Sequence, residues 1–70
     1  MKETYIHGFK VKYEDNAYSG ARYLAYNLEY NEARIFFDRA RSRGSAPFET
    51  NYGKDYTLFY EDGCYIIRKR

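Results

Sequence analysis

The pair Asp62-Gly63 constrains the fold of this chain more than any other feature. It lies between two stretches rich in strand-forming residues, 56–61 and 64–69. Asp-Gly readily adopts the two positive φ angles of a type I′ turn, the two-residue connection that matches the twist of paired antiparallel strands. The sequence therefore predicts that the chain ends in a β-hairpin.

This hairpin would have two partly apolar faces. Its register places Tyr60 opposite Tyr65, Leu58 opposite Ile67 and Phe59 opposite Ile66. Because side chains alternate across a strand, one face collects Tyr56, Leu58, Tyr60, Tyr65 and Ile67, and the other collects Phe59, Cys64 and Ile66. A helix can cover one of these faces, and the second needs another partner or stays exposed.

A strand is also expected near the N-terminus, over residues 4–13. Tyr5, His7, Phe9, Val11 and Tyr13 alternate there with Ile6, Gly8, Lys10 and Lys12. The residues Glu14-Asp15-Asn16 favour turns and should end this strand.

A helix is expected from about Glu29 to Arg43. An apolar stripe runs through Tyr30, Ala33, Phe37 and Ala40 at helical spacing, with Phe36 beside it. Gly44 is suited to end this helix, and Pro47 prevents it from resuming.

Two interpretations remain open for residues 19–28. The helical stripe extends backwards through Tyr26 and Tyr23, and Ser19 could cap one helix of about 24 residues, roughly 36 Å long. Such a helix would overhang strands about 20 Å long. A second strand at about Ala21 to Tyr26 is therefore favoured. A short edge strand is expected at residues 47–51, followed by a turn at 51–54 around Gly53.

Together these elements predict one compact domain over residues 1–70. Its class is α+β, in the order ββα(β)ββ, with one central helix packed on a mainly antiparallel sheet. A chain this short buries only about 60% of the surface exposed when it is unfolded. Aliphatic residues are few, whereas there are ten tyrosines and five phenylalanines. The rings must therefore form much of the core, and an oligomer would help to bury more surface.

The histidine, carboxylate and cysteine side chains do not form a pattern typical of a catalytic site. His7, the only histidine, has no sequence cue to a nucleophile, and the pairs Glu14-Asp15 and Glu61-Asp62 lie where turns are expected. The sequence predicts no enzyme, no cofactor and no metal site. Cys64 is the only cysteine and cannot form an intramolecular disulfide, which suits the cytoplasm. No apolar run is long enough to span a membrane.

The main functional hypothesis is a protein-interaction module. Tyrosine combines a large apolar ring with a polar hydroxyl and is enriched at interfaces. The binding residues would be tyrosines on an exposed sheet face: Tyr5, Tyr13, Tyr56, Tyr60 and Tyr65. Either this face or an exposed edge strand would bind a second copy of the chain, giving a homodimer, or a larger partner protein.

The alternative is a single-stranded nucleic-acid-binding domain. The net charge of +2 is too small to argue for it alone. Clustered cations beside stacked rings would suit such a ligand. The candidate residues are Arg34, Arg39, Arg41, Arg43, Arg68, Lys69 and Arg70.

Overall fold

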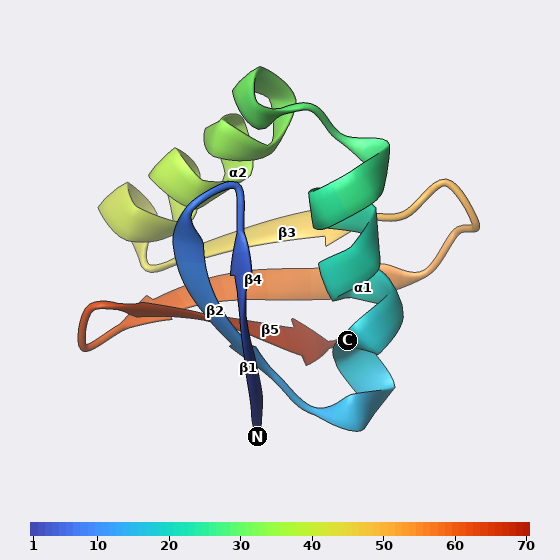
Figure 1. The fold of residues 1–70 in the computed structure, drawn as a ribbon, viewed down its shortest axis with the longest axis horizontal. Coiled ribbons are helices and arrows are strands. Elements are labelled where there is room, and N and C mark those ends of the chain that lie inside the picture. The colour runs from blue at the N-terminus through green and yellow to red at the C-terminus, as the bar shows by residue number, and fades with distance from the viewer.

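The computed structural model describes residues 1–70 as a small α+β domain. The elements in chain order are β1 (Lys2–Ile6), β2 (Phe9–Tyr13), η1 (Asp15–Ala17), α1 (Tyr18–Arg22), η2 (Tyr23–Asn27), α2 (Tyr30–Arg43), β3 (Ser45–Glu49), β4 (Asp55–Glu61) and β5 (Cys64–Lys69). All five strands form one sheet in the order β1-β2-β5-β4-β3 (Figure 1). Strands β2 and β5 are parallel, and every other neighbouring pair is antiparallel.

The C-terminal hairpin has the predicted turn and register. Asp62 and Gly63 have φ angles of 51° and 81°, both in the left-handed region that a type I′ turn requires. The pairs Tyr60–Tyr65, Phe59–Ile66 and Leu58–Ile67 all form. The predicted edge strand is β3, shifted slightly toward the N-terminus.

The prediction of one strand over residues 4–13 was wrong. The chain reverses at His7 and Gly8, whose φ angles are 51° and 88°, and β1 and β2 form a second hairpin. Histidine is one of the few non-glycine residues enriched at positive φ. The alternation of rings in the sequence runs unbroken across this turn and concealed it, although the reversal changes which side chains share a face.

The favoured strand at residues 21–26 was also wrong, because these residues are helical. The segments η1, α1 and η2 follow one another directly and form the first helix (residues 15–27). Ala17, Ala21 and Leu24 are buried on one side of it at helical spacing. A Cβ atom added to Gly20 would lie 2.9 Å from Cγ of Tyr56. Small residues therefore bring this helix very close to the sheet.

The single long helix does not form either, so the expectation of one central helix was wrong. Leu28 has the extended φ and ψ angles −113° and 139°, and Glu29 is extended as well. The side chains of Glu29 and Glu32 then form a capping box that starts α2 at Tyr30. Breaking the helix here gives two shorter helices that both fit over the sheet.

Helix α2 follows its prediction closely. Ala33, Phe37 and Ala40 are buried along the expected stripe. Gly44 has a φ of 90°, and its N–H donates to the carbonyl of Ala40 at 2.7 Å.

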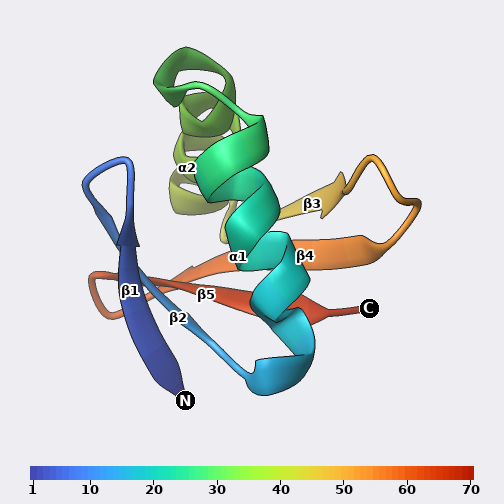
Figure 2. The same ribbon diagram turned by 45° about the vertical axis from the view of Figure 1, so that its right-hand side comes forward.

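Both helices lie on the same face of the sheet (Figure 2). The core between them and the sheet combines five rings with five larger aliphatic residues and five alanines, and further rings pack against it. The ring of Phe37 stacks on Phe9 with centroids 4.3 Å apart and meets the edge of Tyr65 at 4.8 Å. Burial raises the pKa of the Tyr65 hydroxyl. Rings thus supplement the few aliphatic residues of this short chain. Phe59, Cys64 and Ile66 lie on the sheet face that no helix covers.

His7 joins the first hairpin to the first helix. Its Nε2 donates to the carbonyl oxygens of Leu24 and Leu28, at 3.0 and 3.1 Å. Leu24 lies in the last turn of the first helix and Leu28 directly follows it, where carbonyl groups generally lack partners within a helix. The imidazole therefore serves as a C-terminal cap from a distant part of the sequence.

Replacing His7 by asparagine should lower the free energy of unfolding by about 1–2 kcal/mol, because the shorter side chain cannot reach either carbonyl. Asparagine tolerates positive φ, so the turn itself should persist. Urea denaturation measures the change. The matched control is Asp62→Asn, which has the same φ of 51° but caps no helix. An equal loss in both variants would show that the turns, and not the cap, are affected.

Candidate functional site

The five candidate tyrosines do not form an exposed face. Tyr13, Tyr56 and Tyr65 are buried in the core, with 9%, 1% and 6% of their surface exposed. Tyr60 is half-buried, and its ring meets that of Tyr65 at 4.9 Å. Only Tyr5 is well exposed. The helices cover the tyrosine-rich face of the hairpin, so most of these rings serve as core.

The turn at His7 and Gly8 explains why Tyr5 and Tyr13 are separated. In one continuous strand both would face the same side. In the observed hairpin Ile6 pairs with Phe9, so Thr4 shares a face with Val11, and Tyr5 shares the other face with Lys10. The reversal therefore places Tyr5 on the opposite face of the sheet from the buried Tyr13.

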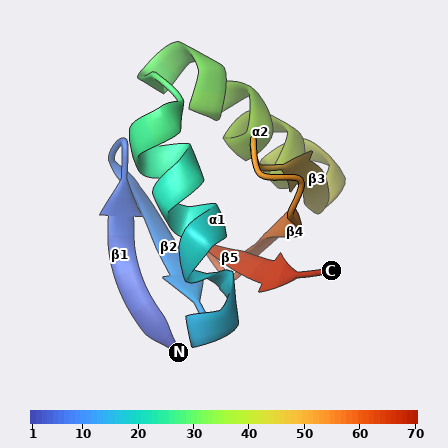
Figure 3. The ribbon, with the colours of Figure 1, turned by 90° about the vertical axis from the view of Figure 1, so that its right-hand side faces the viewer.

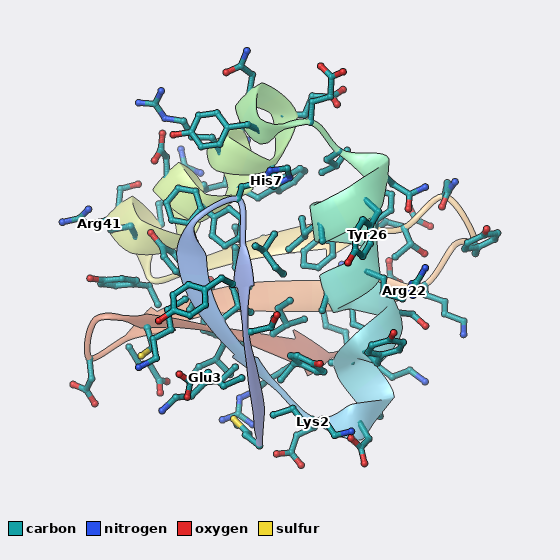
Figure 4. The ribbon with its side chains drawn as sticks, in the orientation of Figure 1. Lys2, Glu3, His7, Arg22, Tyr26 and Arg41 are labelled. Atoms are coloured by element: carbon teal, nitrogen blue, oxygen red, sulfur yellow. The ribbon has the colours of Figure 1, made fainter.

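The candidate basic residues are divided between two ends of the sheet. Arg41 lies over the ring of Tyr60 near the β4–β5 turn, whereas Arg70 pairs with Asp55 at the start of β4, at 3.6 Å. Positions 55 and 60 on one strand are about 17 Å apart. Figure 4 shows Arg41 on α2, and Figure 1 shows the C-terminus at the other side of the molecule.

Several of these cations already have neighbours within the chain. Arg34 pairs with Asp38 at 3.2 Å, and Arg39 lies over the ring of Phe36. Arg43 is exposed at the end of α2, and Arg68 and Lys69 are exposed at the end of β5. The structure does not bring the seven residues into one continuous surface.

The first helix carries an exposed stripe of side chains that was not predicted from the sequence. Tyr18, Arg22 and Tyr26 are four residues apart and lie side by side; Figure 4 labels Arg22 and Tyr26. The guanidinium lies 5.8 Å from the ring centre of Tyr18 and 5.3 Å from that of Tyr26. It also donates to the Tyr18 hydroxyl at 3.2 Å, which raises the pKa of Arg22. The four-residue spacing of these side chains was visible in the sequence. It brings side chains together only on a helix, and a strand was favoured for these residues.

This stripe borders a shallow groove of about 100 Å³ between the first helix and β1. Seven of the nine lining residues are hydrophobic. They are Thr4, Tyr5, Ile6, Tyr13, Tyr18, Ala21, Arg22, Ala25 and Tyr26. Tyr26 is 77% exposed and Tyr18 is 49% exposed, so two rings border an apolar groove at the surface.

Strand β1 forms one edge of the sheet (Figure 3). The groove lies along this strand. Ile6 and Phe9 flank a two-residue turn and form the first hydrogen-bonded pair. Bonded and non-bonded pairs then alternate, so Glu3 and Tyr5 direct their N–H and C=O groups away from β2. No hydrogen bond outside the regular elements uses these groups. Strand β1 therefore presents unpaired backbone groups at the surface.

The opposite edge is less open. Strand β3 has Pro47 at its centre, and proline offers no N–H to an added strand. On β1 the charged side chains of Lys2 and Glu3 pair with Asp15 and Lys10 at 3.5 and 3.2 Å. Because these charged side chains pair within the chain, they leave the outward N–H and C=O groups of β1 uncovered.

The structure thus defines a small α+β domain with one open sheet edge and an aromatic groove beside it. Comparison with protein-family models, curated proteins and solved structures found no match to this chain. No helix combines the length and apolar character needed to cross a membrane. No group of three or more histidine, cysteine, aspartate or glutamate side chains is arranged to hold a metal ion.

Proposed function

We propose that this chain is a protein-interaction module that binds by strand addition at β1, and that its partner is a second copy of itself. The observation that supports this proposal is the position of the open edge of β1 beside the groove bordered by Tyr18 and Tyr26. Strand addition gains affinity from backbone hydrogen bonds, and its specificity comes from the side chains that enter neighbouring hollows.

The backbone of β1 is self-complementary. If two copies of β1 pair antiparallel about a two-fold axis at Thr4, Glu3 of each copy lies opposite Tyr5 of the other. These are the two residues whose backbone groups point outward, so each pair exchanges two hydrogen bonds. The same register closes a symmetric dimer and leaves no free edge on either copy of β1.

The groove adds apolar area to this pairing. Thr4 and Ile6 lie on the helix side of β1, so alternate side chains of an added strand would approach Tyr18 and Tyr26. Tyrosine is enriched among the residues that contribute most to binding. A domain of 70 residues with few aliphatic side chains would gain buried surface in this way.

Single-stranded nucleic-acid binding has less support. It requires cations along one path beside exposed rings. Here Arg41 and Arg70 lie at opposite ends of β4, and most of the tyrosines proposed for stacking are buried.

Size-exclusion chromatography with light scattering should give twice the chain mass of 8.4 kDa for the wild-type protein at high micromolar concentration. Tyr5→Pro removes an outward N–H without removing a β1–β2 hydrogen bond, so this variant should be monomeric. Tyr5→Thr keeps the N–H and should dimerise more strongly than Tyr5→Pro. Circular dichroism and urea denaturation verify that each variant is folded.

Hydrogen exchange gives a second readout that needs no variant. The amides of Glu3 and Tyr5 should be protected at high concentration and should exchange quickly on dilution. A wild-type monomer at high micromolar concentration, or fast exchange at both amides there, would overturn the proposal.

A further inference from the structure

The first helix presents three different faces. Ala17, Ala21 and Leu24 face the core, and the stripe of Tyr18, Arg22 and Tyr26 borders the groove beside β1. A third face borders another cleft, between this helix and the β3–β4 loop, and Arg22 lines both the groove and this cleft. This cleft has a volume of about 530 Å³, which is within the range of small-molecule sites.

The lining of the cleft is polar and carries only positive formal charge. It contains two cations, Arg22 and Lys54, and no carboxylate. The other six residues are Ser19, Tyr23, Asn27, Thr50, Asn51 and Tyr52, and all of them carry a hydroxyl or an amide. Such a lining offers many hydrogen-bond donors to a negatively charged group.

Neither cation is neutralised within the chain. Arg22 and Lys54 take no part in the ion pairs of the structure. Arg22 donates one hydrogen bond, to the Tyr18 hydroxyl, and its guanidinium has further N–H groups. The carboxylate of Glu49 approaches Gly53 in the same loop but does not line the cleft.

The loop side of the cleft is ordered by Thr50, whose side chain is buried. Its Oγ1 accepts hydrogen bonds from the N–H groups of Tyr52 and Lys54, both at 3.3 Å. The N–H of Thr50 donates to the carbonyl of Lys54 at 2.9 Å, and the N–H of Gly53 donates to the carbonyl of Thr50 at 3.0 Å. Four hydrogen bonds to one buried residue therefore hold the backbone of this short loop, including that of Lys54, in a defined conformation.

On the helix side of the cleft, the hydrogen-bonding side chains follow a regular spacing. Ser19, Tyr23 and Asn27 are four residues apart, and the last two lie in the π-helical segment η2. Side chains four residues apart lie on the same side of a helix. Single π turns are frequent at functional sites.

We propose that this cleft binds the phosphate group of a small phosphorylated molecule. Phosphate is recognised by charge-assisted hydrogen bonds from several donors, and an arginine opposite a lysine supplies the two strongest. The volume leaves room for a group attached to the phosphate, and the rings of Tyr23 and Tyr52 supply apolar surface for it. All the lining residues come from one chain, so this site does not depend on dimerisation through β1.

Three probes, titrated at constant ionic strength and followed by NMR, separate the contribution of the phosphate from that of the group attached to it. Inorganic phosphate should shift the amide signals of Asn51, Tyr52 and Lys54 in a saturable way. Adenosine monophosphate should bind at least as tightly if the attached group also contacts the cleft. Adenosine has no phosphate and should shift none of these signals at the same concentrations.

Lys54→Gln should weaken the binding of inorganic phosphate by about tenfold or more, because one charged hydrogen bond is lost. The matched control is Lys12→Gln, which makes the same change at a residue outside the cleft. Tyr5→Pro should bind phosphate as the wild-type protein does, whether or not it dimerises.

Two results would overturn the phosphate site. The first is an absence of saturable shifts in the loop with either phosphate probe. The second is equal weakening by Lys54→Gln and Lys12→Gln, which would indicate a general charge effect. Either result leaves the proposed strand addition at β1 unaffected, because that proposal is measured by mass and by amide exchange.

Discussion

Replacing Phe37 by alanine should lower the free energy of unfolding by about 3–5 kcal/mol. The side chain of Phe37 is fully buried, and its ring contacts Phe9 and Tyr65 at centroid distances of 4.3 and 4.8 Å. Alanine would lose both ring contacts and leave a cavity that the surrounding rings cannot fill. A domain of this size has a total stability of roughly 4–10 kcal/mol, so a large fraction of the variant should be unfolded.

Ile35→Ala is the matched control for this effect. Ile35 lies two residues away on the same helix but is 56% exposed, and removing it should change the stability by about 0.5 kcal/mol or less. Urea denaturation followed by circular dichroism measures both variants. Similar losses at the two positions would contradict the burial of Phe37 and, with it, the placement of α2 over the sheet.

Replacing Gly20 by alanine should destabilise the protein by about 1–3 kcal/mol, although alanine is the better helix former. Helix propensity alone predicts a gain of about 1 kcal/mol. The added methyl group, however, would lie 2.9 Å from Cγ of Tyr56, whose side chain is held in the core. The helix or the ring must shift, and the cost of that shift should exceed the gain in propensity.

The variant Ser19→Ala tests propensity without the clash, because Ser19 is exposed next to Gly20 in the same turn. It should leave the stability nearly unchanged or raise it. The cost of Gly20→Ala should also be smaller in a Tyr56→Leu background, where the ring is absent. A Gly20→Ala protein more stable than the wild type would show that the first helix does not pack this closely on β4.

The elements that the sequence predicted correctly depend on local chemistry. Asp62-Gly63 favours one turn type, and the alternation around it sets the register of β4 and β5. Helix α2 has a continuous apolar stripe and a glycine that ends it. In each case the residues that determine the structure lie within a few positions of one another.

The mistaken elements depend on contacts with distant residues. The segment 21–26 has rings that suit a strand, but as part of a helix it buries Ala21 and follows Gly20, which packs closely against Tyr56. His7 carries no strong turn signal, and its turn is linked to the carbonyls of Leu24 and Leu28. Neither of these long-range contacts can be predicted from the sequence alone.

By itself, the sequence determined the class of the domain, its C-terminal hairpin and its second helix, because turn chemistry and helical periodicity act over short distances. Tertiary structure alone decided which tyrosines are core and which are exposed. The reversal at His7 and Gly8 changed the face on which Tyr5 lies. The first helix covered Tyr13 and Tyr56, and α2 covered Tyr65. Two of the exposed rings, those of Tyr18 and Tyr26, acquired their position beside β1 only when that helix packed on the sheet.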